Sequence, residues 1–451
     1  MKHLLIVVAA LGSLGHGQTP SPIAIRNAKI VPVSGPILAK GTVILRNGLI
    51  EAVGEDVPVP ADAWVLEGDG LTVYPGLMDA MSNWGLPANL APPARPGQAQ
   101  IVGPAAPSGG PPAPPTRPAQ GPEDRPATTS WLKAADEVLL TDRRLETARS
   151  AGFTNAITFP MRGIFAGQGA VINLAGEKSR DMVLDPSAGQ YITLAPSGNG
   201  FPAALFGTIS YIRQIYLDAG HYTLLKQAYA KDPSRVPRPD YDRALEGVLE
   251  SKRILLPANR MVEIDRMIRF TAELKQPTIL YGLREGYRSV DLLKKAGLPV
   301  LVSLKWPAKE PDTDPDEPET YRTLAARDRA PSSPAEFQKA NIKFAFYTDG
   351  VDQPRDLQRA VKKALDAGLS REDAVRAFTL SVAEMYGMAD RLGSIEKGKI
   401  ANLVVTRGDI FDERTKVEMV IIDGKRFTPA PEVPPVAPPK PTANTAGGRP
   451  Q

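Results

Sequence analysis

The sequence predicts a (β/α)8 barrel joined to a small β domain that is built from both ends of the chain. Three observations support this fold class. Apolar strand-like runs alternate with helical patterns about eight times in the middle of the chain, short alternating runs lie near both ends, and proline-rich stretches interrupt or follow these blocks. A repeated order of strand and helix is typical of a parallel barrel.

The first segment has the layout of a secretory signal peptide. Residues 1–17 read MKHLLIVVAALGSLGHG, with a positive start, an apolar run and small residues before Gln18. We therefore expect an exported protein, periplasmic or extracellular. The apolar run is too short to cross a bilayer, since a span needs about 20 residues. No membrane span is expected.

The two ends of the chain predict antiparallel strands. Residues 23–30, 41–46 and 49–53 alternate in polarity, and Asn47-Gly48 is a hairpin turn signal. A similar block returns late in the chain, with strand-like runs at 401–406, 418–422 and 425–427 and a second turn signal at Asp423-Gly424. We expect residues 20–70 and 393–427 to form one composite β domain.

The barrel is expected over residues 71–392. Its candidate strands are residues 71–76, 153–159, 170–174, 191–194, 254–257, 278–281, 300–304 and 342–347. Helical patterns lie between most of them, for example at residues 141–150, 262–274, 289–296 and 357–367. The active site of such a barrel lies beyond the carboxyl ends of its strands.

Proline marks two further segments. Residues 92–126 hold 12 of the 45 prolines, and residues 428–451 are also proline-rich. Both segments lack the aliphatic content that offsets the entropy of ordering. We expect residues 92–126 to form a long flexible loop inserted in the barrel, and its position suggests a lid over the barrel mouth. We expect residues 428–451 to form a disordered tail.

The composition restricts the chemistry. The chain has no cysteine and three histidines, of which His3 and His16 lie in the signal segment, so the mature protein retains only His221. Ordinary zinc sites, cysteine nucleophiles, Fe–S clusters and disulfides are therefore excluded. His221 lies in a helical pattern, where a lone histidine is more often a surface residue than a base. The net charge of +4 comes without a basic stripe, so we expect no nucleic-acid partner.

Two stretches carry a resemblance to a known family. VYPGLMDAMSNWGLP resembles the signature of the amidohydrolase superfamily, and FYTDG, LGSIEKGK and DGK resemble its imidazolonepropionase-like branch in order and spacing. The resemblance implies a TIM barrel with a β-sandwich, and hydrolysis of non-peptide C–N bonds in cyclic amides or related small molecules. A divalent metal would be the family cofactor.

The sequence departs from the family at the metal ligands. The resemblance places Met81, Asn83, Pro257 and Gly282 where the family has metal-binding histidines, and only Asp349 matches a catalytic, metal-binding aspartate. One carboxylate cannot hold a divalent ion tightly, because catalytic zinc sites use about three protein ligands. We therefore expect no metal. The alternative is an oxygen-rich site for a harder ion, drawn from Asp79, Asn83, Glu285 and Asp349.

Other side chains at the strand ends are candidates for ligand binding. Arg260, Arg284 and Lys305 could form a cationic pocket for a carboxylate or a phosphate. The competing interpretation is ion pairing with Asp349 and Glu285. Trp84 could stack on a ligand or simply pack.

Two functions from different classes remain open at this point. The first is a hydrolase that acts through an altered site, and the second is a non-catalytic pseudoenzyme that binds a small ligand or a protein. The first predicts a stoichiometric metal and loss of turnover on Asp349→Ala, whereas the second predicts neither. The sequence leaves enzymatic activity and substrate open, and an oligomer is possible.

Overall fold

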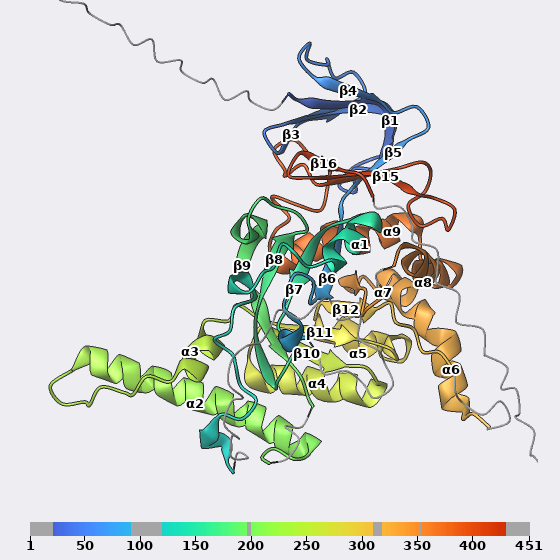
Figure 1. Cartoon of the computed structure of the whole chain (residues 1–451). Helices are drawn as coiled ribbons and strands as arrows, with labels where there is room; N and C mark the ends of the chain where they lie inside the picture. Colours follow the sequence, from blue (N-terminus) through green and yellow to red (C-terminus); the bar gives the residue numbers. More distant parts are fainter. Residues whose placement is uncertain (1–20, 92–119, 196–199, 310–317, 352, 430–451) are drawn as a thin grey trace, which may run out of the picture.

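The structure is a computed structural model that describes residues 21–91, 120–195, 200–309, 318–351 and 353–429. A β domain lies at one end of the molecule and a larger α/β body lies beneath it (Figure 1). The predicted signal segment lies outside the described residues, as do residues 92–119 of the proline-rich insertion and residues 430–451 of the tail.

The β domain combines strands from both chain ends, as predicted. Its strand order is β16-β15-β14-β5-β1-β2-β3, and β4 pairs with β1. Its strands are β1 (Ile23–Ile30), β2 (Leu38–Arg46), β3 (Leu49–Gly54), β4 (Trp64–Glu67), β5 (Thr72–Pro75), β14 (Leu403–Thr406), β15 (Val417–Ile422) and β16 (Lys425–Phe427).

Both predicted hairpin turns are present. Asn47 and Gly48 have φ of 52° and 78°, and Asp423 and Gly424 have φ of 51° and 71°. Two consecutive positive φ values are the geometry of a type I′ turn, which Asn-Gly and Asp-Gly favour. These turns set the antiparallel pairing of β2 with β3 and of β15 with β16.

The second sheet forms a nearly closed barrel, which confirms the predicted fold class. The strand order of its described part is β13-β12-β11-β10-β9-β8-β7-β6. The strands are β6 (Leu77–Ser82), β7 (Phe153–Thr158), β8 (Phe165–Asn173), β9 (Val183–Ile192), β10 (Ile254–Ala258), β11 (Thr278–Gly282), β12 (Val300–Ser303) and β13 (Phe344–Tyr347).

The predicted first barrel strand was wrong. Residues 71–76 contain β5, which pairs with β14 and β1 in the β domain, and the first barrel strand is β6. The apolar run continues through both strands with Gly76 between them, so alternation could not separate them. Asp79 and Met81 therefore lie on a barrel strand instead of in the loop after it.

The third barrel strand also differs from the prediction in its direction. β8 is antiparallel to both β7 and β9. Residues 159–164 connect β7 to β8, and a parallel crossover needs about a dozen residues or more. The chain therefore turns back directly, and β8 and β9 form a long hairpin within an otherwise parallel barrel.

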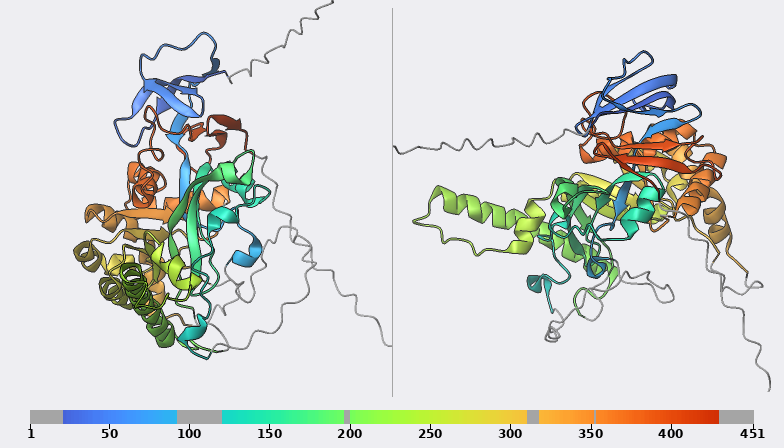
Figure 2. Two further views of the ribbon diagram at one scale, coloured as in Figure 1. Left: turned by 90° about the vertical axis from the view of Figure 1, so that its left-hand side faces the viewer. Right: turned by 45° about the horizontal axis from the view of Figure 1, so that its top comes forward.

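Helices cover the outside of the barrel and extend from it. Their bounds are α1 (Arg144–Ser150), α2 (Leu205–Lys231), α3 (Arg243–Leu249), α4 (Met261–Leu274), α5 (Val290–Ala296), α6 (Tyr321–Arg329), α7 (Ser333–Lys339), α8 (Pro354–Asp366), α9 (Arg371–Ala377) and α10 (Leu380–Tyr386). The far half of α2 projects from the body as an arm (Figures 1 and 2). No helix in the described ranges has the length and apolar character of a membrane span.

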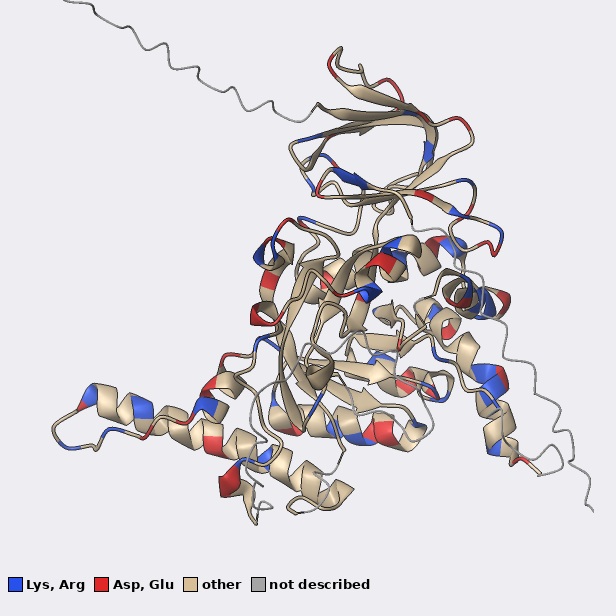
Figure 3. Cartoon of the chain, in the orientation of Figure 1, with Lys and Arg blue, Asp and Glu red and all other residues tan. Residues whose placement is uncertain are grey.

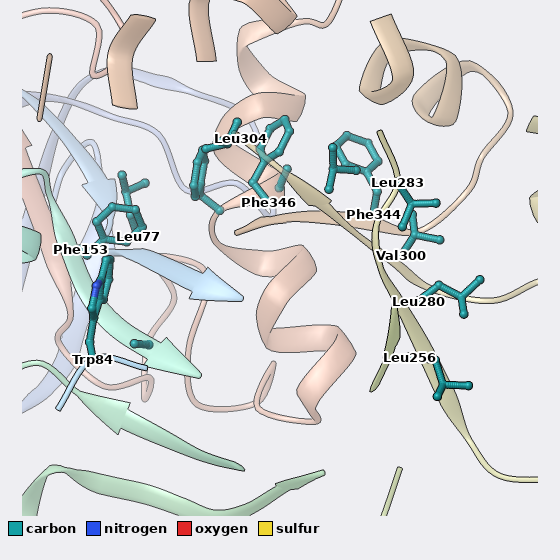
Figure 4. Packing of buried hydrophobic residues seen from close by; sticks show 14 of the residues in the cluster. Leu77, Trp84, Phe153, Leu256, Leu280, Leu283, Val300, Leu304, Phe344 and Phe346 are labelled. Carbon is teal, nitrogen blue, oxygen red and sulfur yellow. The ribbon is translucent and has the colours of Figure 1, made fainter. Parts of the chain in front are cut away.

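Alternation along the barrel strands separates two apolar cores. Leu255, Leu301 and Ala345 pack in the inner cluster, whereas Leu256 and Phe346 belong to the outer cluster under the helices. Figure 4 shows side chains of the outer cluster, which come from several strands and loops. Because successive side chains of a strand point to opposite faces, the inner residues predict which side chains reach the barrel mouth.

Candidate functional site

The inner faces of β12 and β13 lead to a polar group at the barrel mouth. The two strands are parallel neighbours, and Ser303 is paired in register with Tyr347. Continuing the alternation of Leu301 and Ala345, the inner face reaches Ser303 and Lys305 on one side and Tyr347 and Asp349 on the other. The retained aspartate of the family signature is therefore next to a serine and a lysine.

Asp349 accepts a hydrogen bond and faces a cation. Ser303 Oγ donates to Asp349 Oδ2 over 2.9 Å, and Arg284 Nη2 lies 3.9 Å from the same oxygen. Asp349 has φ of 52°, a left-handed conformation that aspartate tolerates. The side chains of Asp349 and Arg284 are 38% and 36% exposed. The pair is therefore loose and accessible.

Arg284 and Lys305 both have unused donors. The Nε of Arg284 is buried without a hydrogen-bond partner among the described residues. The ammonium of Lys305 is half-buried and has no carboxylate within 4.0 Å in the described part of the chain. Two cations against one carboxylate leave a net positive charge beside Asp349.

Three tyrosines close the mouth beneath these charges. Tyr191 on β9, Tyr281 on β11 and Tyr347 on β13 are buried in the inner cluster, and the rings of Tyr191 and Tyr281 stack at 5.3 Å between centroids. Tyr281 Oη donates to the carbonyl oxygen of Ile192 over 3.1 Å. No local sequence pattern predicts this group, since the convergence of the three side chains depends on strand register.

Burial keeps these phenols protonated. Burial, with a further contribution from the Asp349 carboxylate, raises the pKa of Tyr191 to about 12. Burial also raises the pKa of Tyr281 and of Tyr347 well above the usual value, and Asp349 adds to both shifts. Near neutral pH the three hydroxyls are therefore neutral groups that can donate as well as accept hydrogen bonds.

The positions of the family histidines on and after β6 are occupied differently. Met81 is buried in the inner cluster at 5% exposure. Asn83 Oδ1 accepts a hydrogen bond from Arg144 Nη1 over 2.9 Å, and Arg144 Nη2 donates to the carbonyl oxygens of Asn83 and Leu86. Asp142 in turn binds Arg144. A guanidinium therefore holds the amide that would have to coordinate an ion.

The two positions after β10 and β11 cannot replace the missing ligands. Pro257 has no donor atom in its side chain. Gly282 has φ of 107°, a conformation that L side chains rarely adopt, and a Cβ there would lie 2.3 Å from Asn259 Oδ1. A coordinating side chain at residue 282 would require both the backbone and Asn259 to move.

The carboxylates of the oxygen-rich alternative already have partners. Asp79 is fully buried and accepts hydrogen bonds from Thr348 Oγ1 over 2.6 Å and from the backbone N–H of Met81 over 3.2 Å. Glu285 accepts from Arg322 Nε over 3.0 Å and from the N–H of Met261 over 2.9 Å.

The donor set therefore does not fit the family metal. Within the described ranges, no three His, Cys, Asp or Glu side chains lie together as a metal-binding group. Of the carboxylates considered, only Asp349 is both accessible and without a cation in direct hydrogen-bond contact. One accessible carboxylate beside two cations is an unsuitable environment for a divalent ion.

Arg260 and Trp84 are placed outside the polar group of the mouth. Arg260 Nε donates to Glu263 Oε1 over 2.6 Å at the start of α4, and the side chain is 60% exposed. Trp84 is 3% exposed and packs edge-on against Phe153, with ring centroids 5.2 Å apart (Figure 4). Its ring presents no open face to a ligand. His221 is exposed on α2.

A surface cavity of about 400 Å³ lies elsewhere, beside α8, α9 and residues 411–414. Its charges pair among themselves and with neighbours. Lys362 bonds to Asp366 over 2.8 Å, and Arg371 bonds to Asp409 over 2.8 Å. We therefore assign the candidate site to the barrel mouth, whose charged groups are not satisfied in this way.

Comparison with known proteins agrees with the fold. Residues 330–427 match the model of the amidohydrolase family. A search of curated proteins gives no match. Among solved structures, an amidohydrolase from Thermotoga maritima MSB8 is 25% identical, with 90% of this chain and 100% of that chain covered and a TM-score of 0.72.

More distant structures share the fold alone. A putative prolidase from Bifidobacterium longum is 16% identical over 92% of this chain and 97% of its own, with a TM-score of 0.51. A prolidase complexed with N-methylphosphonate-L-proline is 16% identical over 91% of this chain and 100% of its own, with a TM-score of 0.52. The barrel with its composite β domain, the matched segment at residues 330–427 and the Thermotoga structure place the chain in the amidohydrolase superfamily.

Proposed function

We propose that this chain is an exported, amidohydrolase-like binding protein whose barrel mouth holds a small anionic ligand. In this proposal it is a pseudoenzyme with respect to the metal-bound hydroxide chemistry of the superfamily. The observation that carries the proposal is the buried Nε of Arg284, which has no hydrogen-bond partner among the described residues. A carboxylate or phosphate oxygen is the group that such donors bind best.

The ligand oxygens would have several donors within the mouth. Arg284 has an orphan N–H, and Lys305 adds a second positive charge. The neutral phenols of Tyr191 and Tyr347 can supply hydroxyl donors. Asp349 would then be displaced from Arg284, or it would accept a hydrogen bond from a protonated group on the ligand.

Binding is tested with succinate and inorganic phosphate as probes. Calorimetric titration of the mature chain should show saturable binding of one or both anions. Arg284→Gln should weaken that binding at least tenfold, because it removes a charged donor. Arg288→Gln is the matched control, since Arg288 is exposed and lies four residues after Arg284. An equal loss of anion affinity in both variants, or no saturable binding of either anion to the wild type, would contradict the proposal.

Retained hydrolysis is the competing function, and the accessible carboxylate of Asp349 is the observation that favours it. Metal content is measured by elemental mass spectrometry, before and after loading with zinc, manganese, magnesium or calcium. We expect substoichiometric metal under every condition. A tightly held ion near one per chain, with turnover of a cyclic amide that Asp349→Ala abolishes, would support the hydrolase and overturn the binding protein.

Export is the part of the proposal that rests on the sequence alone. Residues 1–17 have the signal layout, and removal before Gln18 leaves the whole β domain intact. Mass spectrometry of the protein recovered from its native cells should give an N-terminus near Gln18. A mature chain that still begins with Met1 would contradict export through a cleaved signal.

A further inference from the structure

Helix α2 is apolar on two opposite faces. Its buried face contains Tyr211, Ile215 and Tyr222, which pack against the outer core. Phe206 and Leu224 are 79% and 64% exposed. These two residues are eighteen positions apart, about five helical turns, and Ile215 lies half-way between them, about two and a half turns from each. The exposed pair therefore points directly away from the buried face.

The exposed face carries an apolar line, which we call the outer stripe and define as Phe206, Leu217, Gly220 and Leu224. Arg213, which pairs with Glu273, lies on the same face between Phe206 and Leu217. Leu217 is 62% exposed and lies seven residues before Leu224, on the same side of the helix. The stripe spans roughly 27 Å. A surface helix normally has one apolar face, and a second one indicates a partner.

Gly220 is a second, independent observation, between Leu217 and Leu224 in the stripe. It is exposed in the interior of a 27-residue helix, where glycine costs about 1 kcal/mol relative to alanine. A Cβ there would meet no atom within 4 Å. No contact in the described chain requires glycine at this position, whereas the close approach of another helix would.

Three of the four charged side chains of α2 are paired within the chain. Arg213 pairs with Glu273, Asp218 pairs with Arg125, and Lys226 pairs with Glu246. The fourth, Lys231, is the last residue of the helix. Gln214 and Gln227, three residues before Leu217 and three residues after Leu224, carry no charge. Figure 3 shows that few charged residues interrupt the arm. A second α2 can therefore approach without placing like charges together.

We propose that α2 is a self-association arm, and that the part of its outer stripe from Leu217 to Leu224 pairs in an antiparallel manner with the α2 of a second copy of this chain. In a two-fold arrangement centred between residues 220 and 221, Leu217 meets Leu224 of the second copy, and Gly220 lies against His221 of the second copy. Each contact then occurs twice, as in an isologous interface. The projection of the arm keeps the two barrels apart (Figure 2).

A second copy matches the stripe better than the two undescribed proline-rich segments of the same chain do. Residues 92–119 and 430–451 contain neither leucine nor phenylalanine. Their large aliphatic side chains are limited to Ile101 and a few valines, whereas a second α2 supplies the same leucines in complementary order. A helix pair of this length buries less than the roughly 800 Å² per partner of a standard interface, so we expect micromolar association.

The test is sedimentation velocity of the mature chain over a concentration series. The wild type should shift from monomer to dimer as concentration rises. Leu217→Glu/Leu224→Glu should weaken the dimer at least a hundredfold, with an unchanged thermal transition because both side chains are exposed. Tyr321→Glu is the matched control, since Tyr321 is 86% exposed on α6, and it should leave the dimer intact.

A cross-link tests the register without depending on that variant. The chain has no cysteine, so Gly220→Cys provides a single thiol, which should join two copies through a short bismaleimide linker. Tyr321→Cys should not. A wild type that stays monomeric at high concentration, or a dimer that survives the double glutamate variant, would overturn the proposal. A dimer that appears only when residues 92–119 are deleted would also overturn it, because the segment would then be the occupant.

Discussion

The two halves of the barrel mouth differ in how their polar groups are used. In the closed half, Met81, Asn83, Gly282 and Glu285 are buried in apolar contacts, bound by arginines or held in a glycine conformation. In the open half, Arg284, Lys305 and Asp349 remain accessible or incompletely paired.

This difference separates a structural half from a binding half. The residues of the closed half make their contacts within the barrel, so the closed half contributes to folding. The open half keeps charges whose pairing is loose, which folding alone does not require. Variants should therefore affect stability in the closed half and binding in the open half.

The largest effect on stability is expected from Arg144→Ala. It removes the hydrogen bonds to Asn83 Oδ1 and to the buried carbonyl oxygen of Leu86, and it leaves Asp142 without its cation. Hydrogen bonds from charged groups contribute about 1.5–3 kcal/mol each, so we expect a loss of about 3 kcal/mol in the free energy of unfolding. Chemical denaturation measures it. Arg143→Ala at the exposed neighbour should change stability by less than about 0.5 kcal/mol.

Gly282→Ala should have the next largest effect. The residue has φ of 107°, and the added Cβ would contact Asn259 Oδ1. We expect a loss of about 2 kcal/mol from backbone strain and crowding. Gly297→Ala is the control, because Gly297 has φ of 65° with no atom within 4 Å of the added Cβ. It should cost about 1 kcal/mol. Equal effects at the two glycines would show that residue 282 is not restricted by Asn259.

Alkaline pH should destabilise the tyrosine layer between the two halves. The pKa of Tyr191 is about 12 in the folded protein and about 10 when unfolded, so the folded state holds its proton more tightly. Its contribution is complete below pH 10 and is lost as pH rises through 12. At pH 11 the wild type should have lost about 1 kcal/mol more of its free energy of unfolding than Tyr191→Phe has. An equal fall in the free energy of unfolding of the two proteins between pH 9 and 11 would contradict this.

The fold was predictable to the extent that it depends on local pattern. The Asn-Gly and Asp-Gly turns required specific residues, and the inner and outer faces of β10 to β13 follow strict alternation. The break between β5 and β6 was not visible, because both strands are buried on both faces and show no alternation. The antiparallel direction of β8 was not visible either, because it depends on how short the connection from β7 is once the barrel is assembled.

The candidate site was predictable only in part. The replacement of the histidines and the retention of Asp349 follow from residue identity, and Arg284 and Lys305 follow from their place after the strands. Arg144 could not be found in this way, since it reaches Asn83 from 61 positions away in the chain. The three tyrosines converge through register, and no local pattern encodes that convergence.

The smallest effect on stability, and the sharpest test of the open half, is expected from Asp349→Asn. Asparagine tolerates the same left-handed backbone conformation and can still accept the hydrogen bond from Ser303. The free energy of unfolding should therefore change by less than about 0.5 kcal/mol. The substitution removes the only carboxylate near Arg284 within the described mouth, so the site gains one net positive charge. If Asp349 competes with a bound anion for Arg284, succinate or phosphate should bind several-fold more tightly to the variant, and the gain should shrink at high salt. Weaker binding in the variant would instead mean that Asp349 holds the ligand itself, and the bound molecule would then need a cationic or protonated group beside its anionic one.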